Sequence, residues 1–205
     1  MEIFIDSAST AEMEKWLRMG VLDGVTTNPS IMLRDGIYDM EVGAKKIAAL
    51  LSPRPVSVEV TTNDLGEMVT QAQKLASWAA NIVIKIPQET QDGIPCYEVI
   101  KQLENEGIKV NATLAMSFGQ VILAAKAGAT YISIFAGRIS DEGGDAPQVI
   151  RDSVEWLERW KYKSKIIVGS IRSVADALQS AVAGAHIITV PPQYLTRMAD
   201  HKNSR

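Results

Sequence analysis

Short apolar runs alternate with longer amphipathic stretches along the whole chain. The amphipathic stretches carry apolar or small residues at positions i, i+3, i+4 and i+7, the spacing of one face of a helix. One of them has this spacing at Met13, Trp16, Leu17 and Gly20. The apolar runs are short, and most are rich in β-branched residues, which predicts buried strands. Eight such runs occur, at residues 3–5, 24–26, 56–60, 82–86, 109–113, 131–135, 165–169 and 186–190.

Glycines stand where the predicted helices should end. They are Gly20, Gly107, Gly128 and Gly184, each a few residues before the next apolar run. Glycine closes many helices because it adopts left-handed backbone angles without a steric cost. The chain is therefore predicted to repeat one unit, a strand followed by a helix.

Eight strand-helix units imply a parallel sheet, because each helix returns the chain to the same edge. The 205 residues show no break in composition and no linker, so we predict one domain, residues 1–205, folded as a (β/α)8 TIM barrel. An open, doubly wound sheet is the structural alternative. That fold commonly carries a glycine-rich phosphate loop, and neither a GxGxxG nor a Walker sequence is present.

Polar residues follow or end seven of the eight apolar runs. In chain order they are Asp6, Asn28, Glu59, Lys85, Thr113, Ser133 and Ser170; the aromatic Phe135 lies two positions after Ser133 and therefore on the same face of its run. Active sites of TIM barrels lie at the carboxyl ends of the strands. These side chains are therefore expected to surround a common centre.

Lys85 stands in the apolar run NIVIKIP, where a parallel strand would bury it on both faces. Burial disfavours the charged form of a lysine and so favours the neutral amine that a Schiff-base nucleophile requires. A lysine that reaches from the strand end to solvent is the alternative, and this position alone fits both. The ring of polar strand ends favours the nucleophile, with Asp6 and Glu59 as groups that transfer protons.

Composition narrows the classes of partner. Hydrophobic residues make up 46% of the chain, and 21 basic residues face 24 acidic ones, for a net charge of -3. This balance offers no basic stripe for nucleic acid, so a small molecule or another protein is the expected partner. A phosphorylated substrate stays possible, because two or three local groups bind a phosphate.

Cys96 is the only cysteine, which excludes an intrachain disulfide and a cysteine-based zinc site. Its spacing to Ile100 and Leu103 predicts a core position on a helix. The two histidines, His186 and His201, stand apart from any carboxylate cluster, so no metal is expected. A strand-like start without a leader segment, and the lack of an apolar run of about 18 residues, predict a cytoplasmic protein that does not enter a membrane.

Seven motifs together resemble one family, the small transaldolases and fructose-6-phosphate aldolases, which are Schiff-base class I aldolase barrels. The motifs are MEIFID, GVTTNPS, VSVEV, VIKIP, NATLAMSFGQ, AGATYISIFAGR and GSIRS, in the order of the family and spread over nearly the whole chain. The resemblance implies sugar phosphates as substrates and no metal or organic cofactor.

The resemblance also implies roles for individual residues. Lys85 matches the Schiff-base lysine, and Asp6 matches the acid/base that acts on the C4 hydroxyl of the sugar. Glu59 and Thr113 match the pair that positions a catalytic water.

Two further groups match residues that bind the substrate. Asn28 and Ser133 match those that hold the hydroxyls of the dihydroxyacetone unit. Arg138, Ser170 and Arg172 match the phosphate site, where guanidinium groups suit a phosphate dianion.

Three positions resemble the transaldolases more than the aldolases. Glu59 stands where the aldolases have glutamine, Phe135 where they have tyrosine, and Ser133 where they have alanine. The resemblance therefore favours transfer of a dihydroxyacetone unit between sugar phosphates. The alternatives are an aldolase that releases free dihydroxyacetone and a noncatalytic barrel, and the retained charges of Lys85, Asp6 and Glu59 count against the latter.

The end of the chain departs from the family. After a segment like TRMADHKNSR the family continues into a further helix that reaches a neighbouring subunit, whereas this sequence stops at Arg205. We expect this helix to be lacking. Small members of the family form pentamers that pair into decamers, so the resemblance implies a homo-oligomer while leaving its size open.

Overall fold

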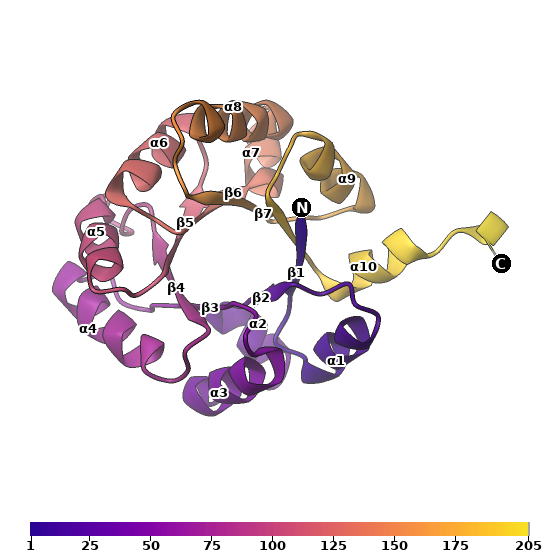
Figure 1. The fold of residues 1–205 in the computed structure, drawn as a ribbon, viewed down its shortest axis with the longest axis horizontal. Helices are drawn as coiled ribbons and strands as arrows, with labels where there is room; N and C mark the ends of the chain where they lie inside the picture. Colours follow the sequence, from indigo (N-terminus) through magenta and orange to yellow (C-terminus); the bar gives the residue numbers. More distant parts are fainter. Residues whose placement is uncertain (205) are drawn as a thin grey trace.

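A computed structural model describes residues 1–204 and shows a closed barrel of eight parallel strands surrounded by helices (Figure 1). The strands are β1 (Glu2–Asp6), β2 (Gly24–Thr26), β3 (Val56–Glu59), β4 (Ile82–Pro87), β5 (Val110–Ala115), β6 (Tyr131–Phe135), β7 (Lys165–Gly169) and β8 (Ile187–Val190). Each strand pairs with its neighbours in the chain, and β8 pairs with β1. The predicted (β/α)8 barrel is confirmed, with every strand boundary within two residues of its expected place.

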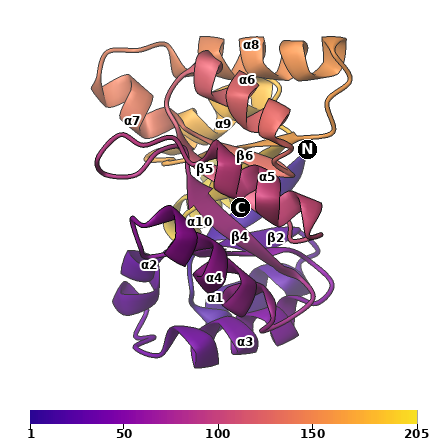
Figure 2. The ribbon, with the colours of Figure 1, turned by 90° about the vertical axis from the view of Figure 1, so that its left-hand side faces the viewer.

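Most helices of the described residues surround the barrel, whereas the chain after β8 runs outward through α10 (Pro192–Ala199) to a 3₁₀ turn, Lys202–Ser204 (Figure 1). The other helices are α1 (Thr10–Arg18), α2 (Pro29–Arg34), α3 (Met40–Leu51), α4 (Leu65–Ala76), α5 (Tyr97–Asn105), α6 (Phe118–Ala127), α7 (Ala136–Asp141), α8 (Ala146–Arg159) and α9 (Val174–Val182). The segment between β2 and β3 contains two helices, α2 and α3. The two short helices α2 and α7 follow directly after β2 and β6, and Figure 2 shows them at the same end of the barrel.

Local chemistry fixes the ends of these helices. All four predicted stop glycines have a positive φ, namely 70° at Gly20, 80° at Gly107, 99° at Gly128 and 95° at Gly184. At the other end, a side-chain oxygen of the preceding residue accepts a hydrogen bond from a first-turn amide. The residues that cap in this way are Ser9, Asn28, Asp39, Asp64, Ser117, Asp145 and Ser173.

Alternation along the strands stacks the barrel interior in layers. Phe4 and Ile167 belong to an apolar cluster at the base, and each lies two residues before a position that lines the open end. Gly24 leaves room for this base, because a Cβ there would lie 2.6 Å from the Phe4 ring. Above it, Ser133 and Asn111 are joined by a hydrogen bond. The barrel interior thus passes from an apolar base to a polar cavity at the carboxyl ends of the strands.

The larger apolar core lies between the strands and the surrounding helices. Cys96, Ile100 and Leu103 are all buried within it, which confirms the predicted core position of the cysteine. Among residues 1–204, no helix combines the length and the apolar character that crossing a bilayer would require.

Candidate active site

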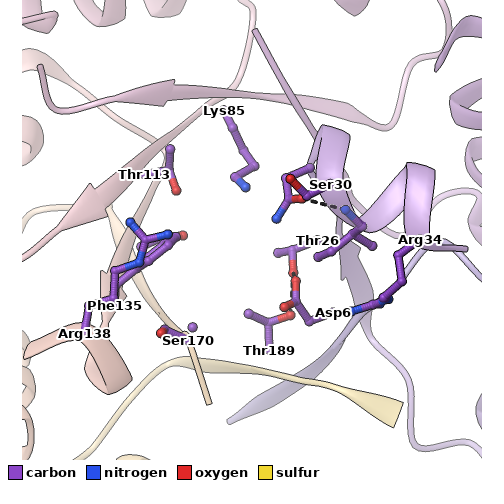
Figure 3. A pocket seen from close by; sticks show the side chains of 14 residues that line it. Asp6, Thr26, Ser30, Arg34, Lys85, Thr113, Phe135, Arg138, Ser170 and Thr189 are labelled. Carbon is purple, nitrogen blue, oxygen red and sulfur yellow. Dashed lines mark hydrogen bonds between the residues drawn. The ribbon is translucent and has the colours of Figure 1, made fainter. Parts of the chain in front are cut away.

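A cavity of about 310 Å³ opens at the carboxyl end of the strands (Figure 3). Eight of the ten predicted site residues line it: Asp6, Asn28, Lys85, Thr113, Ser133, Phe135, Arg138 and Ser170. Five of them lie on four strands, β1, β4, β5 and β6, and the other three lie in the turns after β2 and β7 and in the short helix α7. The strand-end rule thus brings together residues that are up to 164 positions apart, from 6 to 170.

A second hollow of about 550 Å³ adjoins this cavity and is called here the outer lobe. Glu59, the ninth predicted residue, lines the outer lobe, which shares Lys85, Asn28, Phe135 and Arg138 with the cavity. Lys85 therefore faces both spaces, and a substrate in one of them can extend into the other.

Lys85 is 5% exposed, and its amine has two partners. The Nζ atom donates to Glu59 Oε2 at 2.7 Å and to the carbonyl oxygen of Thr27 at 3.0 Å. Glu59 and Lys85 are paired in register on β3 and β4, so neighbouring strands carry the two groups to the same height. The buried amine therefore has a carboxylate within hydrogen-bond distance. That carboxylate can accept the proton that the amine must lose before it attacks a carbonyl carbon.

Asp6 lies on another side of the cavity from Lys85 (Figure 3). Thr26 Oγ1 donates to Asp6 Oδ1 at 2.7 Å, and the Thr26 hydroxyl also lies 2.6 Å from that of Thr189. Burial raises the pKa of Asp6, although the hydrogen bond from Thr26 and the positive charges of Lys85 and Arg34 oppose the rise. A carboxylate with a raised pKa is a stronger base, which suits removal of a proton from a substrate hydroxyl.

Thr113 and Ser133 differ in what their hydroxyls contact. Ser133 Oγ donates to Asn111 Oδ1 at 2.7 Å, and Asn111 Nδ2 lies 3.4 Å from Ser57 Oγ, so Ser133 is held by a polar layer inside the barrel. Thr113 Oγ1 is buried without a hydrogen-bond partner among residues 1–204. Unpartnered buried hydroxyls are rare, and one that borders a cavity is suited to bind a water or a ligand.

Asn28 both caps the N-terminus of α2 and lines the cavity. Its Oδ1 accepts from the amide of Ile31 at 2.8 Å and so caps α2, in which Pro29 occupies the first turn. The cap uses the acceptor end of the side chain. The two hydrogens on Nδ2 are therefore the donors that Asn28 can offer to a ligand.

The predicted phosphate residues are only partly brought together. Arg138, from α7, lines the cavity with its guanidinium 5.1 Å from the Phe135 ring centroid, and Ser170 lines the same cavity. Gly137 lets the start of α7 lie close to Ser170, because a Cβ at this position would collide with the carbonyl oxygen of Ser170. Arg172 lines neither the cavity nor the outer lobe, and its guanidinium instead pairs with Asp141. Its part in binding phosphate stays a prediction.

Comparison with known proteins assigns the chain to a family. The sequence profile of the Transaldolase/Fructose-6-phosphate aldolase family matches residues 3–205. The chain belongs to this family. It is 41% identical over 201 residues to a "Probable transaldolase" of Dehalococcoides mccartyi, covering 98% of this chain and 91% of that one. A second "Probable transaldolase", from Carboxydothermus hydrogenoformans, is 42% identical over 205 residues and is covered to 93% of its length, with all of this chain aligned.

Solved structures with low sequence identity share the fold of this transaldolase-family chain. A mandelate oxidase aligns with a TM-score of 0.62 at 13% identity, covering 93% of this chain and 63% of the oxidase. A designed, cube-shaped protein cage aligns at 0.64 and 18% identity, covering 92% of this chain and 62% of that one. The chain thus spans less than two thirds of each of these proteins. At such identities the likeness shows the barrel fold alone.

Other lining residues of this family member were not predicted. They are Thr26, Ser30, Ile31, Arg34, Gly169 and Thr189. Thr26 and Thr189 were detectable, because each is a polar residue within a short apolar run and lies at a strand end. Arg34 had no such signal, since it reaches the cavity from the end of α2.

The described residues 1–204 contain no group of three or more His, Cys, Asp or Glu side chains arranged to hold a metal ion. His186 is half-buried away from the cavity, and its Nδ1 accepts a hydrogen bond from the amide of Ile166 at 3.0 Å. This contact gives His186 a structural role between β7 and the start of β8.

Proposed function

We propose that this protein is a transaldolase that transfers a dihydroxyacetone unit from a ketose phosphate to an aldose phosphate through a Schiff base on Lys85. One observation carries the proposal. A lysine that is 5% exposed holds its amine 2.7 Å from a carboxylate, at the point where the cavity meets the outer lobe. Membership of the family and the names of its relatives support the same reaction.

The reaction begins when Glu59 accepts a proton from Lys85 and frees the amine. The amine attacks the C2 carbonyl of a ketose phosphate such as fructose 6-phosphate or sedoheptulose 7-phosphate. Loss of the former carbonyl oxygen as water gives an iminium. The unpartnered hydroxyl of Thr113 is the group we assign to hold that water, together with Glu59.

Cleavage follows when Asp6 takes the proton of the C4 hydroxyl. The C3–C4 bond breaks, its electron pair passes into the iminium, and the aldose phosphate leaves with a carbonyl at the former C4. An enamine of dihydroxyacetone stays on Lys85. An acceptor aldose phosphate then reacts by the reverse steps, in which Asp6 returns its proton to the new C4 oxygen and water releases the product from Lys85.

The binding groups suit such a substrate. We assign the hydroxyls of the dihydroxyacetone unit to Asn28 and Ser133, and the phosphate to Arg138 and Ser170, which line one side of the cavity. In this scheme the lysine iminium is the electron sink, so the reaction requires no metal or organic cofactor.

An aldolase that releases free dihydroxyacetone is the second candidate, because the family contains both activities. The enamine is protonated in that reaction, which requires a proton donor near Lys85. Phe135 borders both spaces that Lys85 faces, and its ring offers no such donor. Phe135 therefore favours transfer over release.

A product assay separates the two candidates. Purified protein is given fructose 6-phosphate with and without erythrose 4-phosphate, and glyceraldehyde 3-phosphate, sedoheptulose 7-phosphate and free dihydroxyacetone are quantified. We expect sedoheptulose 7-phosphate to exceed free dihydroxyacetone when the acceptor saturates, and we expect Lys85→Met to form neither. Faster release than transfer by the wild type would make the aldolase the better description, and activity in Lys85→Met would refute the mechanism.

A further inference from the structure

Three residues other than glycine have left-handed backbone angles among residues 1–204: Leu114 with φ 64°, Lys161 with φ 56° and Ser170 with φ 58°. Lys161 directly follows the end of α8, where such a conformation is common. The other two line the spaces around Lys85. Left-handed angles are unfavourable for a leucine, and strained residues of this kind cluster at functional sites.

Leu114 lies in an irregularity of β5. Ala112 pairs with Ile132 of β6 and Ala115 pairs with Ile134, so β5 uses one residue more than β6 between the two pairs. Such a bulge redirects a side chain. In a regular strand Leu114 would point opposite to Thr113 and away from the cavity. With the bulge, Leu114 lines the outer lobe beside Lys85.

Leu114 also lines a hollow of about 360 Å³ that the proposed reaction does not use, called here the side hollow. Four residues border both the outer lobe and the side hollow: Glu89, Gln91, Leu114 and Arg138. Leu114 is half-buried whereas the other three are exposed. Leu114 is thus the half-buried, apolar part of the boundary between the two spaces.

Two amide side chains give the side hollow a polar wall. Gln88 is 2% exposed and lines it. Its Nε2 donates to the carbonyl oxygen of Ala112 at 3.3 Å, while its Oε1 has no hydrogen-bond partner among residues 1–204. Gln120 also lines the hollow, and its Oε1 accepts from the amide of Met116, which leaves its Nε2 as a donor. A polyhydroxylated ligand matches this set of donors and acceptors.

We propose that Leu114 is a specificity-determining residue, which limits the length of the acceptor aldose phosphate by closing the outer lobe off from the side hollow. The proposal rests on the proposed transaldolase function. Under this proposal a four-carbon acceptor stays outside the side hollow, whereas a longer acceptor requires the space that the leucine fills. Arg138 borders both spaces, so it can contact a phosphate in either of them.

The test compares Leu114→Gly and Leu114→Ala with the wild type. With fructose 6-phosphate as the donor, kcat/KM is measured for erythrose 4-phosphate and for arabinose 5-phosphate, and mass spectrometry identifies the seven- and eight-carbon ketose phosphates formed. The open-chain fraction of each sugar is the same for every variant, so it cancels in the comparison. We expect the preference for the four-carbon acceptor to fall at least about tenfold in both variants, in the range of discrimination that one or two methylene-sized groups provide.

Two controls separate specificity from effects on folding. Leu123→Ala removes an exposed leucine of α6 and should leave the preference unchanged. Leu114→Gly should melt at a higher temperature than Leu114→Ala, because glycine relieves the left-handed strain and alanine does not. Adding Gln88→Leu to Leu114→Gly should reverse part of the gain with arabinose 5-phosphate, since it removes the unpartnered acceptor.

The outcomes also separate this inference from the proposed function. Transfer at the wild-type rate with an unchanged acceptor preference in both Leu114 variants would overturn the inference and leave the transaldolase proposal intact. In that case the bulge would serve only to position Thr113. A wild type that forms no transfer product from either acceptor would overturn both.

Discussion

Replacing Glu59 by glutamine should destabilise the protein even though the side chain keeps its size. The carboxylate of Glu59 lies 2.7 Å from the Nζ atom of Lys85, which is buried. Glutamine preserves an acceptor for the amine but removes the negative charge. The buried ammonium would then face only neutral acceptors, the new amide and the carbonyl oxygen of Thr27.

The expected size of the effect follows from the exposure of the pair. A hydrogen bond to a charged group contributes about 1.5–3 kcal/mol. The Glu59 side chain is 23% exposed, so water screens part of the interaction and the lower half of that range applies, about 1.5–2 kcal/mol. A loss of 1 kcal/mol lowers the melting temperature of a domain of this size by about 2–4 °C, which predicts a fall of about 3–8 °C.

Calorimetry of Glu59→Gln and of a matched control, Glu41→Gln, measures this difference. Glu41 lies 2.6 Å from Lys45, and both of these side chains are exposed. Because exposed pairs contribute little, the control should shift the melting temperature by less than about 2 °C. Adding Lys85→Met to Glu59→Gln should recover stability, because it removes the cation that has lost its partner. Equal shifts for Glu59→Gln and Glu41→Gln would refute the reasoning that burial makes the Lys85 pair important.

Three further predictions concern the cavity. Because burial raises the pKa of Asp6, its ionised form destabilises the folded state at neutral pH, and this penalty disappears as the pH falls toward the usual value of 3.8. Asp6→Asn should therefore abolish transfer and yet raise the melting temperature at pH 7, with a gain that shrinks in acid; a lower melting temperature at pH 7 would contradict the raised pKa. Arg138→Ala should lower kcat/KM for fructose 6-phosphate by the equivalent of about 1.5–3 kcal/mol of transition-state stabilisation, and should lower kcat/KM for fructose much less. Arg172→Ala should have the smaller effect of the two substitutions, because the Arg172 guanidinium pairs with Asp141. Equal losses with both donors would mean that Arg138 supports the fold and does not bind the phosphate. Phe135→Tyr should raise the ratio of free dihydroxyacetone to transfer product at saturating acceptor, because a phenol can donate a proton to the enamine; an unchanged ratio would remove Phe135 as the discriminator.

Much of the site was predictable because the carboxyl ends of parallel strands meet at one end of a barrel. Asp6, Lys85 and Ser133 were assigned to a common centre by that rule alone, and they line one cavity. The register between strands was not predictable from the sequence. Glu59 and Lys85 are 26 positions apart, and only the pairing of β3 with β4 makes them partners.

Other features of the site depend on irregular backbone or on residues in helices. The alternation of apolar runs and amphipathic stretches does not predict them. The fifth strand was expected to end at Thr113, but a bulge carries it on to Ala115 and turns Leu114 toward the outer lobe. Arg34 reaches the cavity from the end of a short helix. Ion pairs are equally unpredictable from this alternation, as in the contact of Arg172, which does not line the cavity, with Asp141.

The central claim is that Lys85 forms the covalent intermediate, and reductive trapping tests it most directly. Borohydride reduces an iminium to a stable secondary amine, so treatment together with fructose 6-phosphate should inactivate the protein irreversibly. Peptide mass spectrometry should then find one dihydroxyacetone-derived, three-carbon unit on Lys85 and none on the other lysines. Borohydride without the sugar should leave the protein active, and Lys85→Met should acquire no adduct. An adduct on a different lysine, or full inactivation that leaves Lys85 unmodified, would contradict the mechanism.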